Sequence, residues 1–217
     1  VLLLDQSFKF WIKTNYMIGD SFPVLGDWFL IRFIENPGMA FGLTIDGNYG
    51  KLILSVFRIV AVIAIGFYLR YLVKQQASKG LVGSIALILA GALGNILDSA
   101  FYGLLFSDST LEVARFLPEE GGYASFLHGN VVDMLYFPLI EGQYWDWIPK
   151  LGGQKFVFFR PIFNIADSSI TVGVLLIFLF QRRFCSASPK TAAQPAEAVA
   201  SEAAPDSEPT APADPAE

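Results

Sequence analysis

The sequence of 217 residues has little of the side-chain chemistry that most enzymes use, because it contains one cysteine, Cys185, and one histidine, His128. No disulfide can form within the chain, and one residue of each type cannot make a Cys/His zinc site. A Ser-His-Asp relay could use only His128. Any reaction must come mostly from Asp, Glu, Asn and the backbone, and we expect no metal and no other cofactor.

Charge is also scarce. Only 16% of the residues are charged, whereas soluble domains have about 25%. Hydrophobic residues make up 53%, and the mean hydropathy is +0.48. The net charge of -5 arises entirely after Phe184, so the body of the chain is neutral. A neutral body and a pI near 4.9 argue against a nucleic-acid partner, and the composition is typical of a membrane protein.

Three apolar stretches are long enough to cross about 30 Å of hydrocarbon. They cover residues 52–73, 81–106 and 162–180. We interpret residues 1–4 as part of a first span whose beginning is missing. The alternative is a helix lying in the interface, since Asp5, Lys9 and Lys13 recur at four-residue spacing on one face. The sequence thus predicts an α-helical integral membrane protein with four transmembrane helices, the first one truncated at its start.

The positive charges near the span ends predict the orientation. Residues 70–79 carry three bases and no acid, and Arg182-Arg183 follows the last span. Because Lys and Arg are enriched in cytoplasmic loops, both termini should be cytoplasmic and residues 20–50 and 107–160 should lie outside.

The first of these outer segments predicts β-structure. Residues 28–34 favour strands, and Asn36-Pro37-Gly38 is a turn signal. The second outer segment carries aromatic residues of the kind found at lipid headgroups, namely Tyr144, Trp145, Trp147, Phe156, Phe158 and Phe159. We expect a small extracytoplasmic β-cradle that rests on the bilayer.

The end of the chain has a different composition from the rest. From residue 186 onward it consists of Ala, Pro, Ser, Thr and acids without periodicity, which cannot bury enough surface to offset the entropy of ordering. The sequence therefore predicts a membrane domain, residues 1–184, and a disordered cytoplasmic tail, residues 185–217.

The informative residues are polar groups at membrane depth or at its edge, because each is costly there unless it is paired or used. Asn95 and Asp98 form an i, i+3 pair on one stretch, and Asn164 and Asp167 form another. Each Asn should share a helix face with its Asp. Asp133 precedes the apolar residues 134–137.

Two carboxylates that meet in a site of low dielectric cannot both stay ionised. One keeps its proton and the other can act as a base on water, as in aspartic proteases. Such a pair would hydrolyse a peptide bond without a covalent intermediate. Two readings remain open from the residues alone: the polar groups hydrogen-bond or cap helices, or the acids relay protons in a transporter.

Five segments, taken in order, resemble the motif blocks of lipoprotein signal peptidase (signal peptidase II). They are Asp-Gln-Ser-Phe-Lys at 5–9, Asn-Pro-Gly-Met-Ala-Phe-Gly at 36–42, Gly-Ala-Leu-Gly-Asn-Ile-Leu-Asp at 91–98, Val-Val-Asp-Met at 131–134 and Phe-Asn-Ile-Ala-Asp-Ser-Ser-Ile-Thr-Val-Gly at 163–173. The resemblance extends from about Asp5 to Phe180. One block alone is weak, and five in order are strong.

This resemblance implies an aspartic endopeptidase that removes signal peptides from diacylglyceryl-modified prolipoproteins by cutting before the lipid-bearing cysteine. The family pattern places the catalytic dyad on Asp133 and Asp167, near the outer face of the membrane. The positions that shape the site or hold substrate are Asp5, Asn36, Gly38, Asn95, Asp98 and Asn164. The implied partners are prolipoproteins and membrane lipid, and we expect a monomer, since four helices can close a core alone.

The chain departs from the family pattern in two places. The family commonly has Arg directly after the Asp of the third block, where this chain has Ser99, and the candidate replacements are Arg115, Arg160 and Lys155. Arg58 lies in the middle of another span and could pair or snorkel. Residues 103–130 are also longer than the usual link, and we interpret them as a solvated insertion rather than a cover for the site.

Two other functional classes use the same features. A proton-coupled transporter would use the acids as a relay and would show flux without cleavage. A non-enzymatic membrane scaffold would act through the acidic tail, and both aspartates would then be dispensable.

Overall fold

The computed structural model describes residues 1–37, 48–138, 140–143, 145, 147, 153–158 and 161–185. The expected disordered tail, apart from Cys185, lies outside these residues. The elements in chain order are α1 (Leu2–Asn15), β1 (Ser21–Leu25), β2 (Phe29–Asn36), α2 (Asn48–Lys74), α3 (Lys79–Leu97), a π-helical turn η1 (Asp98–Tyr102), α4 (Gly103–Leu105), β3 (Val131–Tyr136), β4 (Ile140–Gln143), β5 (Lys155–Phe158), β6 (Ile162–Phe163) and α5 (Ile165–Cys185).

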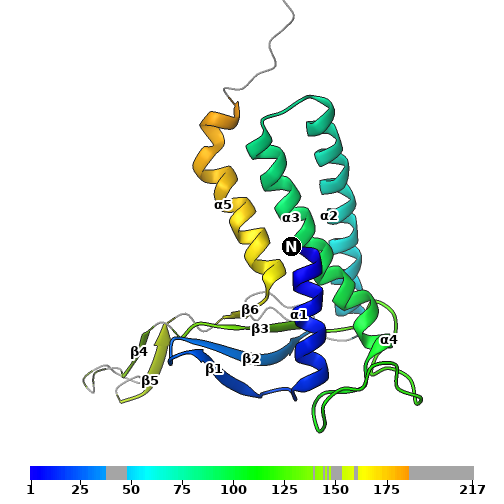
Figure 1. The fold of residues 1–217 in the computed structure, drawn as a ribbon, viewed down its shortest axis with the longest axis vertical. Coiled ribbons are helices and arrows are strands. Elements are labelled where there is room, and N and C mark those ends of the chain that lie inside the picture. The colour runs from blue at the N-terminus through cyan, green and yellow to red at the C-terminus, as the bar shows by residue number, and fades with distance from the viewer. Residues whose placement is uncertain are drawn as a thin grey trace, which may run out of the picture.

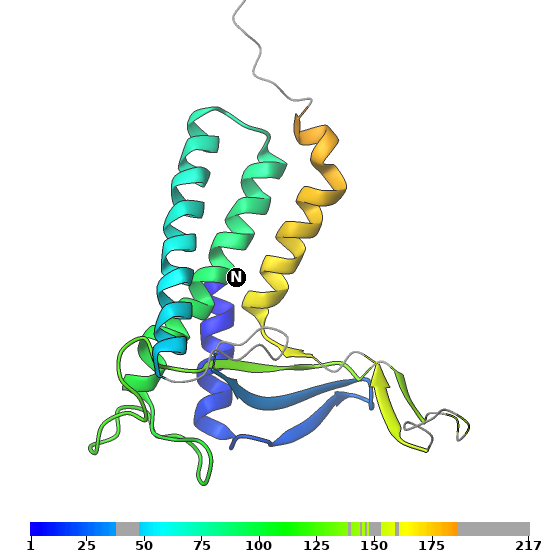
Figure 2. The ribbon, with the colours of Figure 1, turned by 180° about the vertical axis from the view of Figure 1, so that it is seen from behind.

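The long helices α2, α3 and α5 stand beside one another, and the sheet crosses one end of them (Figures 1 and 2). The connection between α2 and α3 and the C-terminal end of α5 lie together at the opposite end. Among the described residues, three helices are long and apolar enough to cross a membrane: Leu52–Lys74, Lys79–Leu105 and Ile165–Arg182. These three confirm the three long predicted spans. Helix α1 has 14 residues and is not among them.

The last span begins later than the apolar run predicts. Ile162 and Phe163 form the short strand β6, and the helix starts only at Ile165. Asn164 separates the two elements, because its Oδ1 accepts a hydrogen bond from the backbone N–H of Asp167 at 2.8 Å. In return Asp167 Oδ2 accepts from the backbone N–H of Asn164 at 3.4 Å. This reciprocal capping box fixes both the helix start and the direction of the Asp167 side chain.

Helices α3 and α5 approach each other closely through glycine. A Cβ atom on Gly91 of α3 would lie 2.3 Å from the carbonyl oxygen of Ala166, and one on Gly173 of α5 would lie 2.7 Å from the carbonyl oxygen of Ser84. Small residues let helix backbones pack tightly in a membrane. The contact brings the end of α3 that carries Asn95 beside the start of α5, which carries Asp167.

The predicted β-structure is a four-stranded antiparallel sheet with the order β1-β2-β3-β6. Strand β2 covers the expected run from residue 29 onward and pairs with β1 as a hairpin, while Trp28 lies in the turn between them. In β3, Asp133 is the partner of Ile34, and Leu135 is the partner of Phe163. Strands β4 and β5 form a separate pair. The ends of β2 and β6 therefore flank Asp133.

The main core of buried side chains lies between α1, the sheet and the segment after α3. Val132 and Met134 of β3 point into it and are fully buried, together with Ile12, Phe33 and Phe106. Since side chains alternate along a strand, Asp133 points away from this core.

The long segment that follows α3 is partly built into the same core. Phe106, Ser109 and Ala114 are buried, and Phe106 forms a bridge with Phe116. The centre of the segment, at residues 119–122, is exposed. Residues 110–113 and 115–117 are exposed as well, so the prediction of a solvated insertion holds for much of the segment but not for the side chains that pack inward.

Candidate active site

Helix α1 has its polar face inside and its apolar face outside. Asp5, Lys9 and Lys13 are at most 1% exposed, whereas Leu3 and Leu4 are 84% and 69% exposed. The four-residue spacing of the charges places them on one face, and this face packs against the rest of the protein. A charged side chain at such depth needs a partner of opposite charge, and each of the three has one within the described residues.

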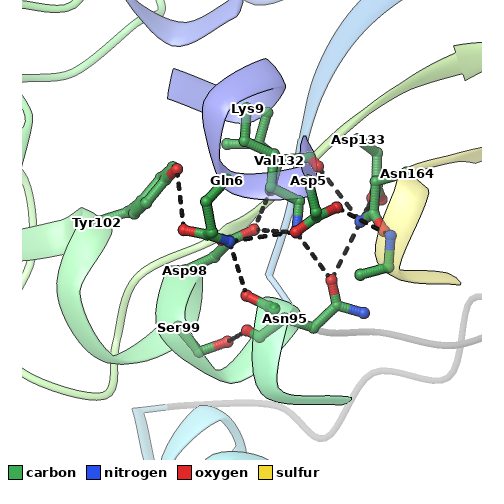
Figure 3. A network of polar contacts seen from close by, with 12 residues as sticks. Asp5, Gln6, Lys9, Asn95, Asp98, Ser99, Tyr102, Val132, Asp133 and Asn164 are labelled. Atoms are coloured by element: carbon green, nitrogen blue, oxygen red, sulfur yellow. Dashed lines mark hydrogen bonds and ion pairs between the residues drawn. The ribbon is translucent and has the colours of Figure 1, made fainter. Parts of the chain in front are cut away.

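The first group of polar residues is a buried ion cluster, formed by Asp5, Gln6, Lys9 and Asp98. The ammonium group of Lys9 lies 3.0 Å from Asp5 Oδ2 and 2.7 Å from Asp98 Oδ2. Gln6 Nε2 donates to Asp98 Oδ1 at 2.9 Å. Figure 3 shows these side chains meeting beneath α1, beside Asn95 and Val132.

The buried ion cluster also holds two backbone segments. Asp5 Oδ1 accepts from the backbone N–H of Ala166 at 2.8 Å, and Asp98 Oδ2 accepts from that of Val132 at 3.2 Å. Both of these backbone groups are adjacent in sequence to an aspartate of the predicted dyad. The cluster thus positions β3 and the start of α5 relative to α1 and α3.

The second group contains the two predicted dyad residues, which two asparagines connect. Asn164 Nδ2 donates to Asp133 Oδ1 at 2.6 Å and also lies 3.1 Å from Asn95 Oδ1. Asn95 Nδ2 donates to Asp167 Oδ1 at 2.7 Å. We call Asp133 and Asp167 the carboxylate pair. The amides fix one oxygen of each carboxylate, and this restricts how both side chains can turn.

The environments of the two carboxylates differ. Asp133 is 2% exposed, and its burial, together with the negative charge of Asp167, raises its pKa to about 7. Hydrogen bonds from Asn36 and Asn164 oppose this rise. Asp167 lies at the start of α5, where the helix dipole favours a carboxylate, and is only half-buried. Burial and the neighbouring negative charge thus favour protonation of Asp133 near neutral pH.

A pair that carries one proton can act as an acid and a base on the same water molecule. Among the described residues, no group of three or more His, Cys, Asp or Glu side chains is arranged to hold a metal ion. Every fully buried side-chain nitrogen or oxygen in that part of the chain has a hydrogen-bond partner. The polar network is therefore complete before any substrate binds.

The structure brings together most of the residues that the sequence singled out. Asn36, at the end of β2, donates to Asp133 Oδ2 at 3.3 Å. Together with the bond from Asn164 to Oδ1, both carboxylate oxygens of Asp133 thus accept from an amide. Gly38 lies outside the described residues. Gln6 and Lys9 were not among the predicted site residues, although the spacing of Asp5 and Lys9 in an apolar helix was a usable signal for an internal ion pair.

Of the three side chains considered as replacements for an arginine at position 99, the structure describes only Arg115. Arg115 is 60% exposed and pairs with Glu112 and Glu120, so it points away from the carboxylate pair. Arg160 and the side chain of Lys155 lie outside the described residues. His128 bonds within its own turn, to Ser125 and Phe126.

Comparison with known proteins identifies the family to which the chain is similar. The model of the family described as signal peptidase (SPase) II matches residues 1–182. The lipoprotein signal peptidase of Porphyromonas gingivalis is 46% identical over 187 residues, which cover 86% of this chain and 81% of the relative. The lipoprotein signal peptidase of Amoebophilus asiaticus is 38% identical over 184 residues, covering 83% and 74%.

A solved structure described as a bacterial membrane enzyme, determined by the in meso method at 2.3 Å resolution, is similar with a TM-score of 0.55. Its sequence is 28% identical, and the match covers 85% of this chain and 84% of that one. The extent of the family match and the identity to the curated relatives both exceed what a shared fold alone would give. The chain belongs to the signal peptidase II family, the lipoprotein signal peptidases.

Proposed function

We propose that this protein is an aspartic endopeptidase, in which the carboxylate pair removes the signal peptide of a diacylglyceryl-modified prolipoprotein by cutting before the lipid-bearing cysteine. Membership of the family supports a peptidase of prolipoproteins over a transporter or a scaffold. The observation that carries the mechanism is the joining of Asp133 and Asp167 by Asn164 and Asn95, with a raised pKa on Asp133.

The reaction begins with a water molecule between the two side chains. The ionised carboxylate, which we assign to Asp167, accepts a proton from the water as its oxygen attacks the scissile carbonyl carbon. Protonated Asp133 gives its proton to the carbonyl oxygen, and a neutral tetrahedral intermediate forms. The proton on Asp167 then passes to the amide nitrogen as the C–N bond breaks, and Asp133 regains its proton from the intermediate's hydroxyl group.

The buried ion cluster supports this step without taking part in it. It binds the backbone next to each member of the pair, at Val132 and Ala166. Catalysis by an acid and a base depends on their geometry to within fractions of an ångström. We therefore assign Asp5 and Asp98 to support of the site, together with Asn36, Asn95 and Asn164.

The proposal is tested by cleavage of a synthetic signal peptide with a diacylglyceryl-cysteine, using detergent-purified protein. Asp133→Asn and Asp167→Asn should each reduce turnover to background while the thermal unfolding transition remains cooperative. Asp27→Asn, in the exposed turn between β1 and β2, is the matched control and should cleave normally. Turnover that survives at either position of the pair would refute the mechanism.

We further propose that α1 is part of a fourth membrane helix and that the site faces outward from the bacterial inner membrane. An apolar face that is exposed on a helix with a charged inner face is what hydrocarbon surroundings favour. Arg70, Lys74 and Lys79 lie at the end of the helices opposite to the sheet, as the positive-inside rule expects of the cytoplasmic end.

Cysteine labelling tests this orientation, because Cys185 is the only native thiol. In a Cys185→Ser background, Leu111→Cys should react with an impermeant maleimide from outside intact cells, since Leu111 is 91% exposed beside the sheet. Gln76→Cys, in the α2–α3 connection, should react only after permeabilisation. The reverse pattern would overturn the topology. We also propose a monomer as the working unit, since four helices can close a core alone.

A further inference from the structure

Position 99 is buried and carries serine where the family pattern commonly has arginine. Ser99 is 4% exposed, and its hydroxyl donates to the carbonyl oxygen of Asn95 at 3.1 Å. Its own carbonyl oxygen accepts from the backbone N–H of Gly129 at 2.9 Å. A Cβ atom on Gly129 would lie 2.4 Å from the carbonyl oxygen of Asp98, so this segment packs tightly over the turn.

Arg58 reaches the same position from α2. Its Nη1 donates to Ser99 Oγ at 3.4 Å, and its side chain is half-buried. Ser55, one turn earlier, is buried and donates to the carbonyl oxygen of Leu127 at 2.9 Å. Residues three apart share a helix face, so Arg58 lies on the inner face of α2, whereas Phe57 and Val60 are 68% and 59% exposed.

The charges that act on Arg58 are those of the site. The carboxylates that attract it are Asp167, Asp133 and Asp98, with Asp167 foremost. Of these, Asp98 already pairs with Lys9 in the buried ion cluster. Lys9 also attracts Asp133, but its ammonium group contacts Asp5 and Asp98, so Arg58 is a second cation that acts on the carboxylate pair.

We propose that Arg58 is a positioning residue that supplies the positive charge for the carboxylate pair, and that it replaces from α2 the arginine that the family pattern has at position 99. This inference rests on the proposed aspartic mechanism. With one proton on the pair, the pair carries one negative charge, which a guanidinium group balances. Arginine suits this role because its charge persists when it is partly buried.

The pH profile of cleavage reports this charge. The charged and titratable groups around the pair come from every element packed against it: Asp5 and Lys9 of α1, Arg58 of α2, Asp98 of η1, Asp133 of β3, Asp167 of α5, and His128 in the segment that contacts Ser55. Loss of a nearby cation makes ionisation of the pair harder. Both limbs of the profile should therefore move to higher pH.

Arg58→Gln is the main test, because glutamine keeps the apolar stem and a polar end group but carries no charge. We expect kcat/KM to fall at least tenfold at acidic pH, with both limbs displaced upward by about one pH unit. Arg58→Lys keeps the charge and should retain the wild-type profile. Arg70→Met, at the exposed end of the same helix, is the matched control and should cleave as wild type does.

The double variant Arg58→Gln/Ser99→Arg moves the cation to the position of the family pattern and should restore part of the lost activity. If Arg58→Gln alone does not fold, recovery of a folded, active protein in the double variant supports the inference, and a folded but inactive double variant overturns it. An unmoved profile in Arg58→Gln also overturns it. If Asp133→Asn or Asp167→Asn still cleaves, it is the aspartic mechanism that has failed, whatever Arg58 does.

Discussion

Replacing Asp133 with asparagine should abolish cleavage and yet stabilise the folded protein at neutral and alkaline pH. Asp133 is almost completely buried, and its pKa in the fold is about 7, compared with an ordinary value of 3.8. Between these two values the unfolded chain has lost the proton and the folded chain keeps it. The wild type therefore loses stability as the pH rises from about 4 to about 7, and this loss persists above pH 7.

The two pKa values set the size of the effect. The difference between the pKa of Asp133 in the unfolded and in the folded chain corresponds to a loss of about 4 kcal/mol of unfolding free energy, since each pKa unit is worth about 1.4 kcal/mol. Asparagine still accepts the bond from Asn164, which is 2.6 Å long in the wild type, but it has one acceptor oxygen fewer for Asn36. That lost bond costs about 1 kcal/mol. The free energy of unfolding of the variant should thus be about 3 kcal/mol higher than that of the wild type at pH 8 and slightly lower near pH 4.

Thermal unfolding in detergent over this pH range measures the difference directly. The stability of Asp133→Asn relative to the wild type should grow steadily with pH and then level off above pH 7. Asp27→Asn, whose side chain is exposed, should show no such trend. A difference that does not change with pH would mean that Asp133 has no raised pKa, and the assignment of Asp133 as the acid would fall with it.

Two further substitutions test the packing around the site. Lys9→Met should destabilise the protein by about 3 to 5 kcal/mol, because two buried carboxylates lose their cation. Lys79→Met, at an exposed site, is the control and should leave the stability unchanged. Equal losses of stability in the two variants would contradict the role of the buried ion cluster. Gly91→Ala should cost about 1 to 3 kcal/mol and lower kcat, because its Cβ would meet the carbonyl oxygen of Ala166. Gly83→Ala, which has open space, is its control, and similar thermal unfolding and turnover in the two would refute the close contact.

The membrane helices were the most predictable part of the fold. Hydrocarbon requires long apolar stretches, and three such stretches became α2, α3 and α5. The start of α5 was missed because Ile162 and Phe163 are as apolar as the helix that follows, so hydropathy cannot separate a strand from a span. Only the capping bonds of Asn164 mark that boundary. The π-helical turn after Leu97 likewise has no signature in composition.

The site was predictable as a set of residues but not as a set of contacts. The spacing of Asn95 and Asp98 correctly placed them on one face, since Lys9 reaches both. Nothing local links Lys9 to Asp98 or Asn164 to Asp133, because these partners meet only when the chain has folded. The pairing of Asp133 with Asp167 came from the family resemblance, and the sequence left open whether Arg58 pairs with another residue or snorkels.

The inward charges of α1 bear on the order in which the molecule is assembled. Lys9 depends on Asp98 and Lys13 on Glu35, and both of these carboxylates are synthesised after α1. Glu35 can meet Lys13 before α3 is made, but until Asp98 has emerged from the ribosome Lys9 has only the Asp5 side chain as its partner. A helix in that state is disfavoured in lipid. Stable insertion of α1, as the proposed fourth membrane helix, should therefore wait for α3, so that the site and the membrane topology are completed in the same late step of biogenesis.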